Sequence, residues 1–437
     1  MMDRRTGRIM LLGAGALSLT AGLAGCGAST PTATSKKGPV DIVYWSGHAS
    51  GALHAAVVQE VADFNATHPG IHVTFKPEGA SSHGLAAFEA GRSPNVGMVS
   101  SYVVPQFAKA GALVNLKSYL DGSQGLTTAE IHKLYYPTIW SDMQNGNGVQ
   151  YMMPLEKKAN MVIYYNESLF KKAGITNLPT TWNEVSRDAA KIRALGSKYH
   201  GFAWTPYLGD LYEMTLANGG QVFTTATHRT HFALDNSGAV QALSMLRNWI
   251  KNGTMILTSG FEYQLDFGTG NIGMVIDTTA GYTYDKSAIG GKFAMGGIPS
   301  PAGTSGHSSQ YINGASLVMF NTGTSSQRAA SWTFMKYMSS PATNTYWDKH
   351  TNYLPLGPQE TSNMQSFWSQ HPAQAGSFSD PAQWWYKPRG AVGNWTASQT
   401  AMDSIFEKAL NGTLGITQAL KQMDTVGTSY LTGKVRG

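Results

Sequence analysis

The glycines of Gly268–Gly273 carry the most specific chemical pattern in the sequence. Their spacing, Gly-Thr-Gly-Asn-Ile-Gly, matches the fingerprint of a dinucleotide-binding loop. That loop works only when a strand precedes it and a helix follows it, because the pyrophosphate then meets the N-terminus of the helix. In this chain a helix-like stretch precedes the glycines and the strand-like run Gly273–Ile276 follows them. The sequence therefore predicts a glycine turn that enters a strand, and no bound cofactor.

The histidines are not spaced for a metal site. His68 and His72 are four residues apart, but Pro69 and Gly70 between them prevent the helix that would direct both rings to one metal. The chain also has neither a His-Glu-x-x-His zinc pattern nor a Gly-x-Ser-x-Gly nucleophile elbow. We therefore expect no metal and no activated serine.

A pair of carboxylates could hydrolyse a glycosidic bond, one acting as the acid and the other as nucleophile or base. The candidates for such a pair are Glu78, Glu89, Glu156, Asp210, Glu213 and Asp277. The sequence does not give the distances between them, and it contains no recognisable glycosidase motif. A binding protein that is not an enzyme is favoured, and a glycan hydrolase stays an alternative.

Cys26, the only cysteine in 437 residues, follows a short apolar run near the N-terminus. Three arginines precede the run Ile9–Leu23, and the small residues Ala24 and Gly25 follow it. This order is typical of an export signal, and about 15 apolar residues are fewer than the ~20 that a spanning helix needs. A cysteine after Leu-Ala-Gly resembles the lipobox of bacterial lipoproteins. We therefore expect residues 1–25 to be removed and Cys26 to carry the lipid that anchors the protein to the membrane.

The charge of the chain is low and scattered. The formal net charge is +6, and 13% of the residues are charged. Lysines and arginines form no blocks, which argues against a nucleic-acid surface, and the many Gly, Ser, Thr, Asn and aromatic residues suit a polar ligand of little charge. Residues 26–39 are small and polar and are predicted to form a flexible tether, so the folded body begins near Val40.

Alternating strands and helices must position any binding residues in this body. The first series is a strand at Val40–Trp45, a helix at Ala52–Asn65, a strand at Ile71–Phe75, a helix at His83–Gly91 and a strand at Val96–Val99. This alternation predicts an α/β lobe with a parallel sheet and crossover helices. Later in the chain, Thr181 and Glu184 have the spacing of a capping box that opens an amphipathic helix.

Several short motifs stand in the order found in one family. They are Phe64-Asn65 with His68–Val73, Phe88–Val96, Tyr164–Asn166 with Phe170–Gly174, and Pro179–Glu184. Together they resemble family 1 of the extracellular solute-binding proteins, which serve sugar-type ABC importers. Ile312–Leu317 and Asn352–Leu356 are most similar to the glycerol 3-phosphate binding branch of that family.

The resemblance implies a two-lobed periplasmic binding protein fold of the α/β, type II-like class, with discontinuous lobes and hinge crossings. We expect the first lobe at residues 40–155 plus about 280–335, and the second at 156–279 plus about 336–437. The implied protein is a monomeric, lipid-anchored subunit outside the bacterial plasma membrane. It would capture a carbohydrate or glycerol 3-phosphate-type solute between the lobes and deliver it to ABC permease subunits. A surface lipoprotein that hydrolyses glycans stays the alternative.

Flat aromatic rings and short polar groups are the side chains that bind sugars and polyols. Trp45 and Ser46 end the first strand, and ligands bind at strand ends in open α/β sheets. The resemblance adds further candidates for ligand contacts, which are Ser100, Ser101, Trp204, Tyr207, Thr279, Gly281, Asn313, Gly314 and Tyr353.

Whether the expected ligand carries a phosphate turns on the presence of an arginine that could pair with it. The glycerol 3-phosphate branch pairs the phosphate with an arginine directly before Gly-Asn, but here Val392 precedes Gly393-Asn394. Arg389 is the nearest candidate for a phosphate contact through its guanidinium fork, and Lys157 and Lys158 could add charge. A sugar, an oligosaccharide, glycerol 3-phosphate and a glycerophosphodiester all remain compatible.

Overall fold

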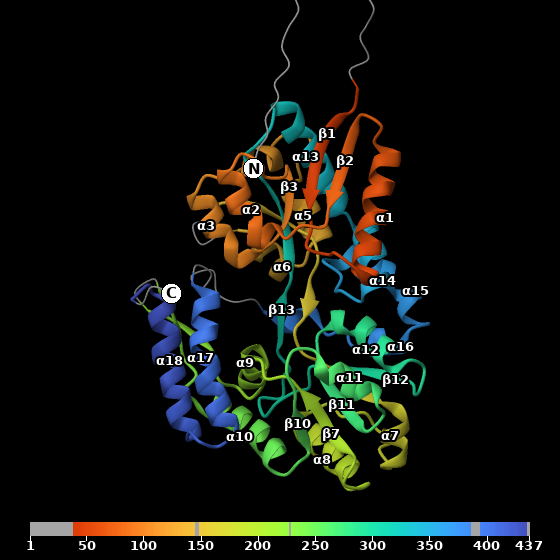
Figure 1. The fold of residues 1–437 in the computed structure, drawn as a ribbon, viewed down its shortest axis with the longest axis vertical. Coiled ribbons are helices and arrows are strands. Elements are labelled where there is room, and N and C mark those ends of the chain that lie inside the picture. The colour runs from red at the N-terminus through yellow and green to blue at the C-terminus, as the bar shows by residue number, and fades with distance from the viewer. Residues whose placement is uncertain (1–37, 145–147, 227–228, 386–393, 435–437) are drawn as a thin grey trace, which may run out of the picture. The chain divides into compact units, whose positions relative to one another are not determined.

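The computed structural model describes residues 38–144, 148–226, 229–385 and 394–434. The predicted signal peptide (1–25), nearly all of the predicted tether with Cys26, and Arg389 lie outside these ranges. Residues 39–437 form one structural unit (Figure 1). Within the described ranges, none of the helices has the length and apolar character needed to cross a bilayer.

The first five-stranded sheet combines strands from the start and the last third of the chain. Its strand order is β2 (Ile71–Lys76), β1 (Val40–Trp45), β3 (Val96–Ser100), β14 (Ala315–Met319) and β4 (Met152–Pro154). As the alternation predicts, β1 runs parallel to β2 and β3, and helices α1 (Gly51–Thr67) and α2 (Ala80–Glu89) make the crossovers. β14 is antiparallel to β3 and β4. The apolar core between this sheet and its helices includes Tyr44, Phe64, Leu317 and Phe334. We call this sheet with its helices the first lobe.

The second five-stranded sheet is built mainly from the middle of the chain. Its strand order is β10 (Met255–Leu257), β7 (His200–Trp204), β11 (Ile272–Asp277), β6 (Val162–Asn166) and β12 (Met295–Pro299). β7 runs parallel to β10 and β11, whereas β6 is antiparallel to β11 and β12. Helices α8 (Trp182–Arg193) and α10 (Ser237–Lys251) pack against it and bury Trp182 and Leu243 in its core. We call this sheet with its helices the second lobe.

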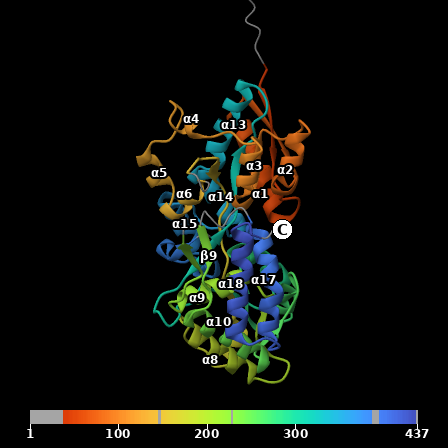
Figure 2. The same ribbon diagram turned by 90° about the vertical axis from the view of Figure 1, so that its left-hand side faces the viewer.

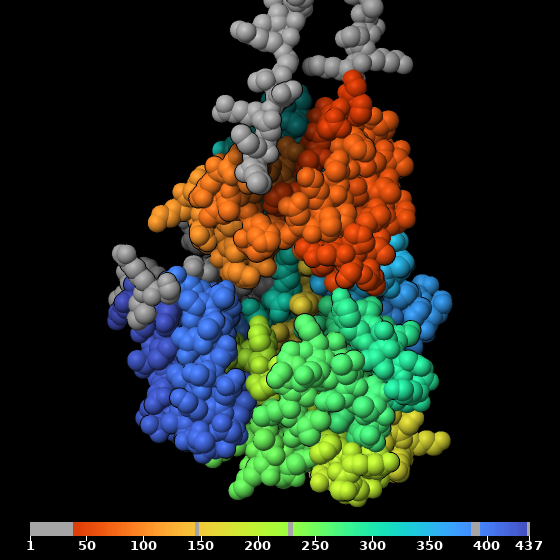
Figure 3. Space-filling view, viewed as in Figure 1, coloured from red at the N-terminus to blue at the C-terminus, as the bar shows by residue number. Residues whose placement is uncertain are grey.

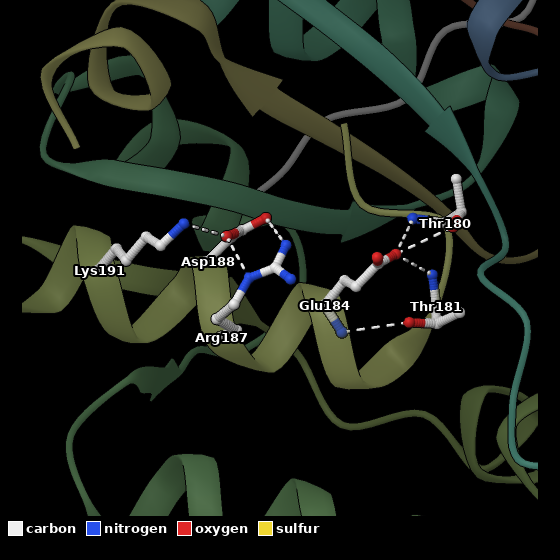
Figure 4. Close-up of polar contacts among 6 residues, drawn as sticks. All are labelled: Thr180, Thr181, Glu184, Arg187, Asp188 and Lys191. Atoms are coloured by element: carbon white, nitrogen blue, oxygen red, sulfur yellow. Dashed lines mark hydrogen bonds and ion pairs between the residues drawn. The ribbon is translucent and has the colours of Figure 1, made fainter. Parts of the chain in front are cut away.

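Helix α8 begins at the predicted capping box (Figure 4). Thr181 Oγ1 accepts a hydrogen bond from the Glu184 backbone N–H at 3.3 Å, and Glu184 Oε2 accepts one from the Thr181 N–H at 3.1 Å. One turn later, buried Asp188 accepts hydrogen bonds from Arg187 and Lys191, each at 3.0 Å. The capping bonds satisfy N–H groups that have no partner inside the helix, so they fix where α8 starts.

The last two helices, α17 (Trp395–Leu410) and α18 (Ile416–Leu431), lie side by side and pack against the second lobe (Figures 1 and 2). Their buried residues include Phe406 and Leu420. The remaining elements are α3 (Val104–Lys109), α4 (Lys117–Leu120), α5 (Thr128–Leu134), α6 (Pro137–Asp142), α7 (Glu167–Lys172), α9 (Leu208–Ala217), β8 (Phe223–Ala226), β9 (Arg229–Phe232), α11 (Glu262–Gly268), α12 (Tyr282–Ile289), α13 (Ser325–Met338), α14 (Pro341–Thr351), α15 (Pro358–Trp368), α16 (Pro372–Gly376) and three short 3-10 helices at Ser101–Val103, Thr279–Gly281 and Pro381–Gln383.

A three-stranded sheet lies where the chain passes between the lobes. Its strand order is β15 (Trp384–Trp385), β13 (Gln310–Asn313) and β5 (Lys158–Ala159). β5 follows β4 of the first lobe and precedes β6 of the second, and β13 leads from β12 back to β14 through Gly314. Gly314 has φ +145°, and a β-carbon there would lie 2.2 Å from the carbonyl oxygen of Glu156. Only glycine permits this close approach of the two crossing segments.

The glycine pattern at Gly268–Gly273 forms the predicted turn into a strand. Helix α11 ends at Gly268, and β11 starts at Ile272. A β-carbon at Gly268 would lie 2.4 Å from the carbonyl oxygen of Ala288, and one at Gly273 would lie 2.4 Å from Cδ1 of Ile192. Tight packing therefore explains two of these glycines.

The return of the chain to the first lobe comes later than the sequence suggested. β12, which lies within the segment 280–335 expected in the first lobe, pairs with β6 of the second sheet. The first sheet is re-entered with β14, and α13 then packs on first-lobe elements. Helix α14, which lies in the segment 336–437 expected in the second lobe, also packs on α1 of the first lobe. The exact lobe boundaries stay a prediction.

Candidate functional site

A cavity of about 700 Å³ is lined by residues from both lobes and from the crossing segments. Figure 3 shows the surface hollowed between the first-lobe residues coloured orange and the second-lobe residues coloured green. First-lobe and α6 residues on its wall are Ser81, Met98, Ser100, Ser101, Tyr102 and Asp142. The crossing segments contribute Glu156, Lys158, Asn160, Tyr311, Asn313, Gly314, Ala315 and Tyr353. Second-lobe residues are Thr205, Pro206, Tyr207, Asp210, Gly260, Phe261, Tyr263, Ile276, Asp277, Thr278, Trp395, Thr396, Gln399 and Thr400.

The structure brings part of the predicted contact set to this cavity. The residues of that set on its wall are Ser100, Ser101, Tyr207, Asn313, Gly314 and Tyr353. Ser100 ends β3 and Ser101 begins the following 3-10 helix, so both lie at the strand end where the fold class places ligands. Tyr353 follows Asn352, the one described residue other than glycine with positive φ. That left-handed residue ends α14 and turns the chain toward the cavity.

Other members of the predicted set lie behind the wall. Trp45 is buried in the first lobe, and Ser46 is fully buried with its hydroxyl on the sulfur of Met98. Trp204 is also buried, and Thr279 Oγ1 accepts a hydrogen bond from the Ala159 N–H. A β-carbon at Gly281 would overlap the Asp277 carboxylate, lying 2.0 Å from its Oδ2. Arg389 lies outside the described residues. A direct contact with ligand stays a prediction for all of these residues.

Asp210 is a buried acid of the cavity wall that two side chains hold by hydrogen bonds. Its Oδ2 accepts a 2.7 Å hydrogen bond from the indole Nε1 of Trp204, and its Oδ1 accepts a 2.9 Å bond from Asn160 Nδ2. Burial raises the pKa of Asp210 to about 7, although these two hydrogen bonds act in the opposite direction. The carboxyl group is therefore held in one orientation and titrates near neutral pH.

Asp277 is a second buried acid on the wall, at the end of β11. It accepts hydrogen bonds from Gln264 Nε2 at 2.9 Å and from the Thr278 backbone N–H. Burial raises the pKa of Asp277 above its usual value, against the effect of those hydrogen bonds. Neither Asp210 nor Asp277 forms an ion pair with a described residue.

Glu156 is held by an ion pair with His48 on the loop after β1. The distance from His48 Nε2 to Glu156 Oε2 is 2.7 Å. Burial lowers the pKa of His48, but the charge of Glu156 and its hydrogen bond outweigh this effect and raise that pKa above 6.5. His48 therefore fixes one carboxylate of the wall.

Aromatic side chains lie at the mouth of the cavity on both lobes. Tyr102 of the first lobe is 38% exposed, and Tyr207 and Phe261 of the second lobe are 43% and 74% exposed. Exposed aromatic rings on a cavity wall can stack on the apolar face of a sugar or polyol.

The sequence reasoning missed several residues of this wall. Tyr102, Asn160, Phe261 and Tyr263 were not among the candidates, and Asp210 and Asp277 appeared only among possible hydrolase acids. One usable signal existed for Asp277, because it ends a wholly buried strand. Among the described wall residues, the carboxylates are Asp142, Glu156, Asp210 and Asp277, and Lys158 is the only lysine or arginine. Such a wall offers many hydrogen-bond acceptors for hydroxyl groups.

No group of three or more histidine, cysteine or acidic side chains that could hold a metal occurs in the described ranges. The residues of the cavity wall can form hydrogen bonds, ion pairs and aromatic stacking contacts.

Comparisons with known proteins give the same picture of the fold. Residues 48–345 match the family of bacterial extracellular solute-binding proteins. The sn-glycerol-3-phosphate-binding periplasmic protein UgpB of Pectobacterium atrosepticum is 23% identical over 434 residues, which cover 93% of this chain and 95% of that protein. A putative binding protein of Brucella abortus is 25% identical over 311 residues, 68% of this chain and 71% of that protein.

Two solved structures share the fold over nearly the whole chain. UgpB from Mycobacterium tuberculosis, solved in complex with glycerophosphocholine, has a TM-score of 0.76 at 18% identity and covers 92% of this chain and 100% of its own. The cyclic α-maltosyl-1,6-maltose binding protein of Arthrobacter globiformis has a TM-score of 0.75 at 20% identity, with coverage of 91% and 100%. The two-lobed α/β fold predicted from the sequence is confirmed.

Proposed function

This chain belongs to the bacterial extracellular solute-binding proteins, and from that premise we propose that it is the substrate-binding subunit of an ABC importer. It captures a carbohydrate or a glycerol phosphate-type solute between its lobes and delivers the solute to membrane permease subunits. The observation that carries this proposal is the cavity of about 700 Å³ with walls from both lobes. A ligand that touches both walls would favour a closed arrangement of the lobes, because its affinity would be higher for that state.

The described wall favours a neutral, hydroxyl-rich ligand over a phosphate. In the described part of the wall, Glu156 and Asp142 lie beside His48 and Lys157, and burial raises the pKa of Asp210 and of Asp277. These acids offer hydrogen-bonding groups to hydroxyls, whereas Lys158 is the one lysine or arginine of the described wall that could face a phosphate. Relatives point to both ligand classes, since their names include glycerol 3-phosphate, glycerophosphocholine and a cyclic maltose derivative. A phosphate ligand would need a cation such as Arg389, which lies outside the described residues.

The same proposal includes the location of the protein in the cell. Cys26, with its preceding signal, would carry the lipid, and the tether to residue 39 would keep the binding domain beside the permease at the outer face of the plasma membrane. A Cys26→Ala protein should lose both the lipid mass on its N-terminal peptide and its membrane association. Retention of the protein in the membrane fraction would contradict the anchor.

The glycan hydrolase considered as an alternative is not favoured, because the matching family and the similar solved structures are binding proteins. Incubation of the protein with a panel of glycans checks this point. Stoichiometric binding with no turnover supports the proposed function, and turnover that disappears on mutating one carboxylate supports the hydrolase.

A calorimetric and thermal-shift screen tests the binding function directly. The panel contains glycerol 3-phosphate, glycerophosphocholine and maltose-type sugars, and small-angle scattering follows compaction on addition of each. A binding ligand should raise the melting temperature and compact the protein. If no member of a broad panel did either, the proposal would fall. Arg389→Ala then separates the classes, since a neutral sugar should lose little affinity and a phosphate much.

A further inference from the structure

We propose that Lys157 is a positioning residue of the hinge. Its buried ammonium group connects the crossing segments and thereby fixes the positions of the cavity residues beside them. The inference goes beyond the proposed function and takes from it only the premise that the two lobes move relative to each other.

The Lys157 ammonium group joins two crossing segments. Its side chain has no exposed surface. Nζ donates hydrogen bonds to the Ala315 carbonyl oxygen at 2.9 Å and to Ser316 Oγ at 2.8 Å. Lys157 precedes β5, whereas Ala315 and Ser316 begin β14, so these bonds connect the outward and the returning crossing of the chain. Burial of an ammonium group costs free energy unless its N–H donors have acceptors. The hydrogen bonds to Ala315 and Ser316 therefore offset the cost of burying Lys157.

The backbone of Lys157 contacts a third segment. Its carbonyl oxygen accepts a 2.7 Å hydrogen bond from the Leu354 N–H, in the stretch between α14 and α15. Gly314 lies against the same residue, because a β-carbon at 314 would be 3.1 Å from the Lys157 Cα. Three segments that are distant in sequence therefore meet at one residue.

Asp142 and Ala315, which contact the Lys157 ammonium group, line the cavity, although Lys157 itself does not. Asp142 Oδ2 lies 3.8 Å from its Nζ, and Ala315 accepts its hydrogen bond. Glu156 and Lys158, on either side of it in sequence, are also on the wall. A change in the position of Lys157 would thus displace acids and carbonyl groups on several sides of the cavity at once. Lys157 would act on binding through these groups and not by touching the ligand.

Spin labels on the two lobes can measure this role without any ligand. In the full chain, Cys26→Ala removes the only native thiol, and Ala86→Cys on α2 and Ala190→Cys on α8 introduce labels at exposed positions of the first and second lobes. Double electron–electron resonance then gives the distribution of distances between the lobes. Lys157→Met keeps the length of the side chain and removes the ammonium group.

We expect the distance distribution of Lys157→Met to be at least about twice as broad as that of the parent, because more lobe orientations become populated. Ser316→Ala, which removes one acceptor, should broaden it less. The matched control is Lys336→Met, since Lys336 Nζ donates to the Gln124 carbonyl oxygen away from the crossings. This control should keep the parent width.

If Lys157→Met has the same width of the distance distribution as the parent, the inference is overturned, even if the melting temperature falls. Lys157 would then stabilise the fold without restricting the orientation of the lobes. Equal broadening in Lys336→Met also overturns the inference. If Lys157→Met does not fold, Ser316→Ala decides, and an unchanged width then rejects the hinge role. Since no ligand is present, a failed ligand screen would remove the proposed function and leave this result standing.

Discussion

The indole Nε1 of Trp204 donates a 2.7 Å hydrogen bond to Oδ2 of Asp210, and only the acid of this pair reaches the cavity wall. Trp204 is 1% exposed at the end of β7, and Asp210 lies in the first turn of α9. A large buried aromatic side chain thus fixes the direction of a carboxylate on the wall. The consequence is that Trp204 can influence ligand binding without touching the ligand.

Replacing Trp204 by phenylalanine tests this relationship. Trp204→Phe keeps an aromatic ring and removes the N–H donor, so Asp210 loses one of its two orienting hydrogen bonds. We expect the affinity for the ligand found in the screen to fall by about 1 kcal/mol, the usual scale of one hydrogen bond. Isothermal titration calorimetry measures the change. Trp249→Phe is the control, because Trp249 Nε1 donates to Ser186 Oγ elsewhere in the second lobe. An equal loss in both variants would contradict a specific role of Trp204.

The raised pKa of Asp210 predicts a pH dependence of stability. The pKa is about 7 in the folded protein and about 3.9 in an unfolded chain. Between these values the folded protein binds more protons at this site than the unfolded chain does, so its contribution to stability increases as the pH falls from about 7 toward 4. Above pH 7 the buried charge destabilises the fold. Urea unfolding of the wild type and Asp210→Asn at pH 5 and pH 8 measures this contribution. The free energy of unfolding of Asp210→Asn, relative to that of the wild type, should be higher at pH 8 than at pH 5. The same difference at both pH values would refute the assignment.

Local signals in the sequence predicted part of the fold. The alternation from Val40 to Val99 predicted the parallel part of the first sheet, and the Thr181 and Glu184 pair marked the start of α8. The return to the first lobe was less predictable. Whether β12 pairs with β6 or joins the other sheet depends on contacts between distant segments, which leave no local pattern.

The candidate site was only partly predictable for a related reason. The strand-end rule pointed to Ser46, but this residue is fully buried behind Met98, which takes its hydroxyl hydrogen bond and itself lines the cavity. Asp210 and Asp277 resembled any other acid in the sequence, because their burial and their donors come from segments distant in the chain. Side-chain direction and desolvation are tertiary properties.

Tyr353 is the predicted contact whose position on the wall can be tested most simply. Tyr353→Ala should weaken binding by more than ~1 kcal/mol, the scale of losing a buried aromatic contact. The fold should persist, which circular dichroism can check beside calorimetry. Tyr346→Ala, a partly buried tyrosine of α14 that is not on the wall, is the matched control. Unchanged affinity in Tyr353→Ala would remove this residue from the site.

Gly314 lies where two crossing segments approach closely. Gly314→Ala would place a methyl group 2.2 Å from the Glu156 carbonyl oxygen in a backbone with φ +145°. Steric overlap adds to backbone strain, so we expect a loss of at least about 2 kcal/mol in the free energy of unfolding. Gly306→Ala separates the two causes, because Gly306 also has positive φ (+79°) but no atom within 4 Å of its β-carbon position. Denaturant unfolding of both variants should show a clearly larger loss for Gly314→Ala. Equal losses would mean that backbone strain alone, and not the contact between the crossings, requires glycine at position 314.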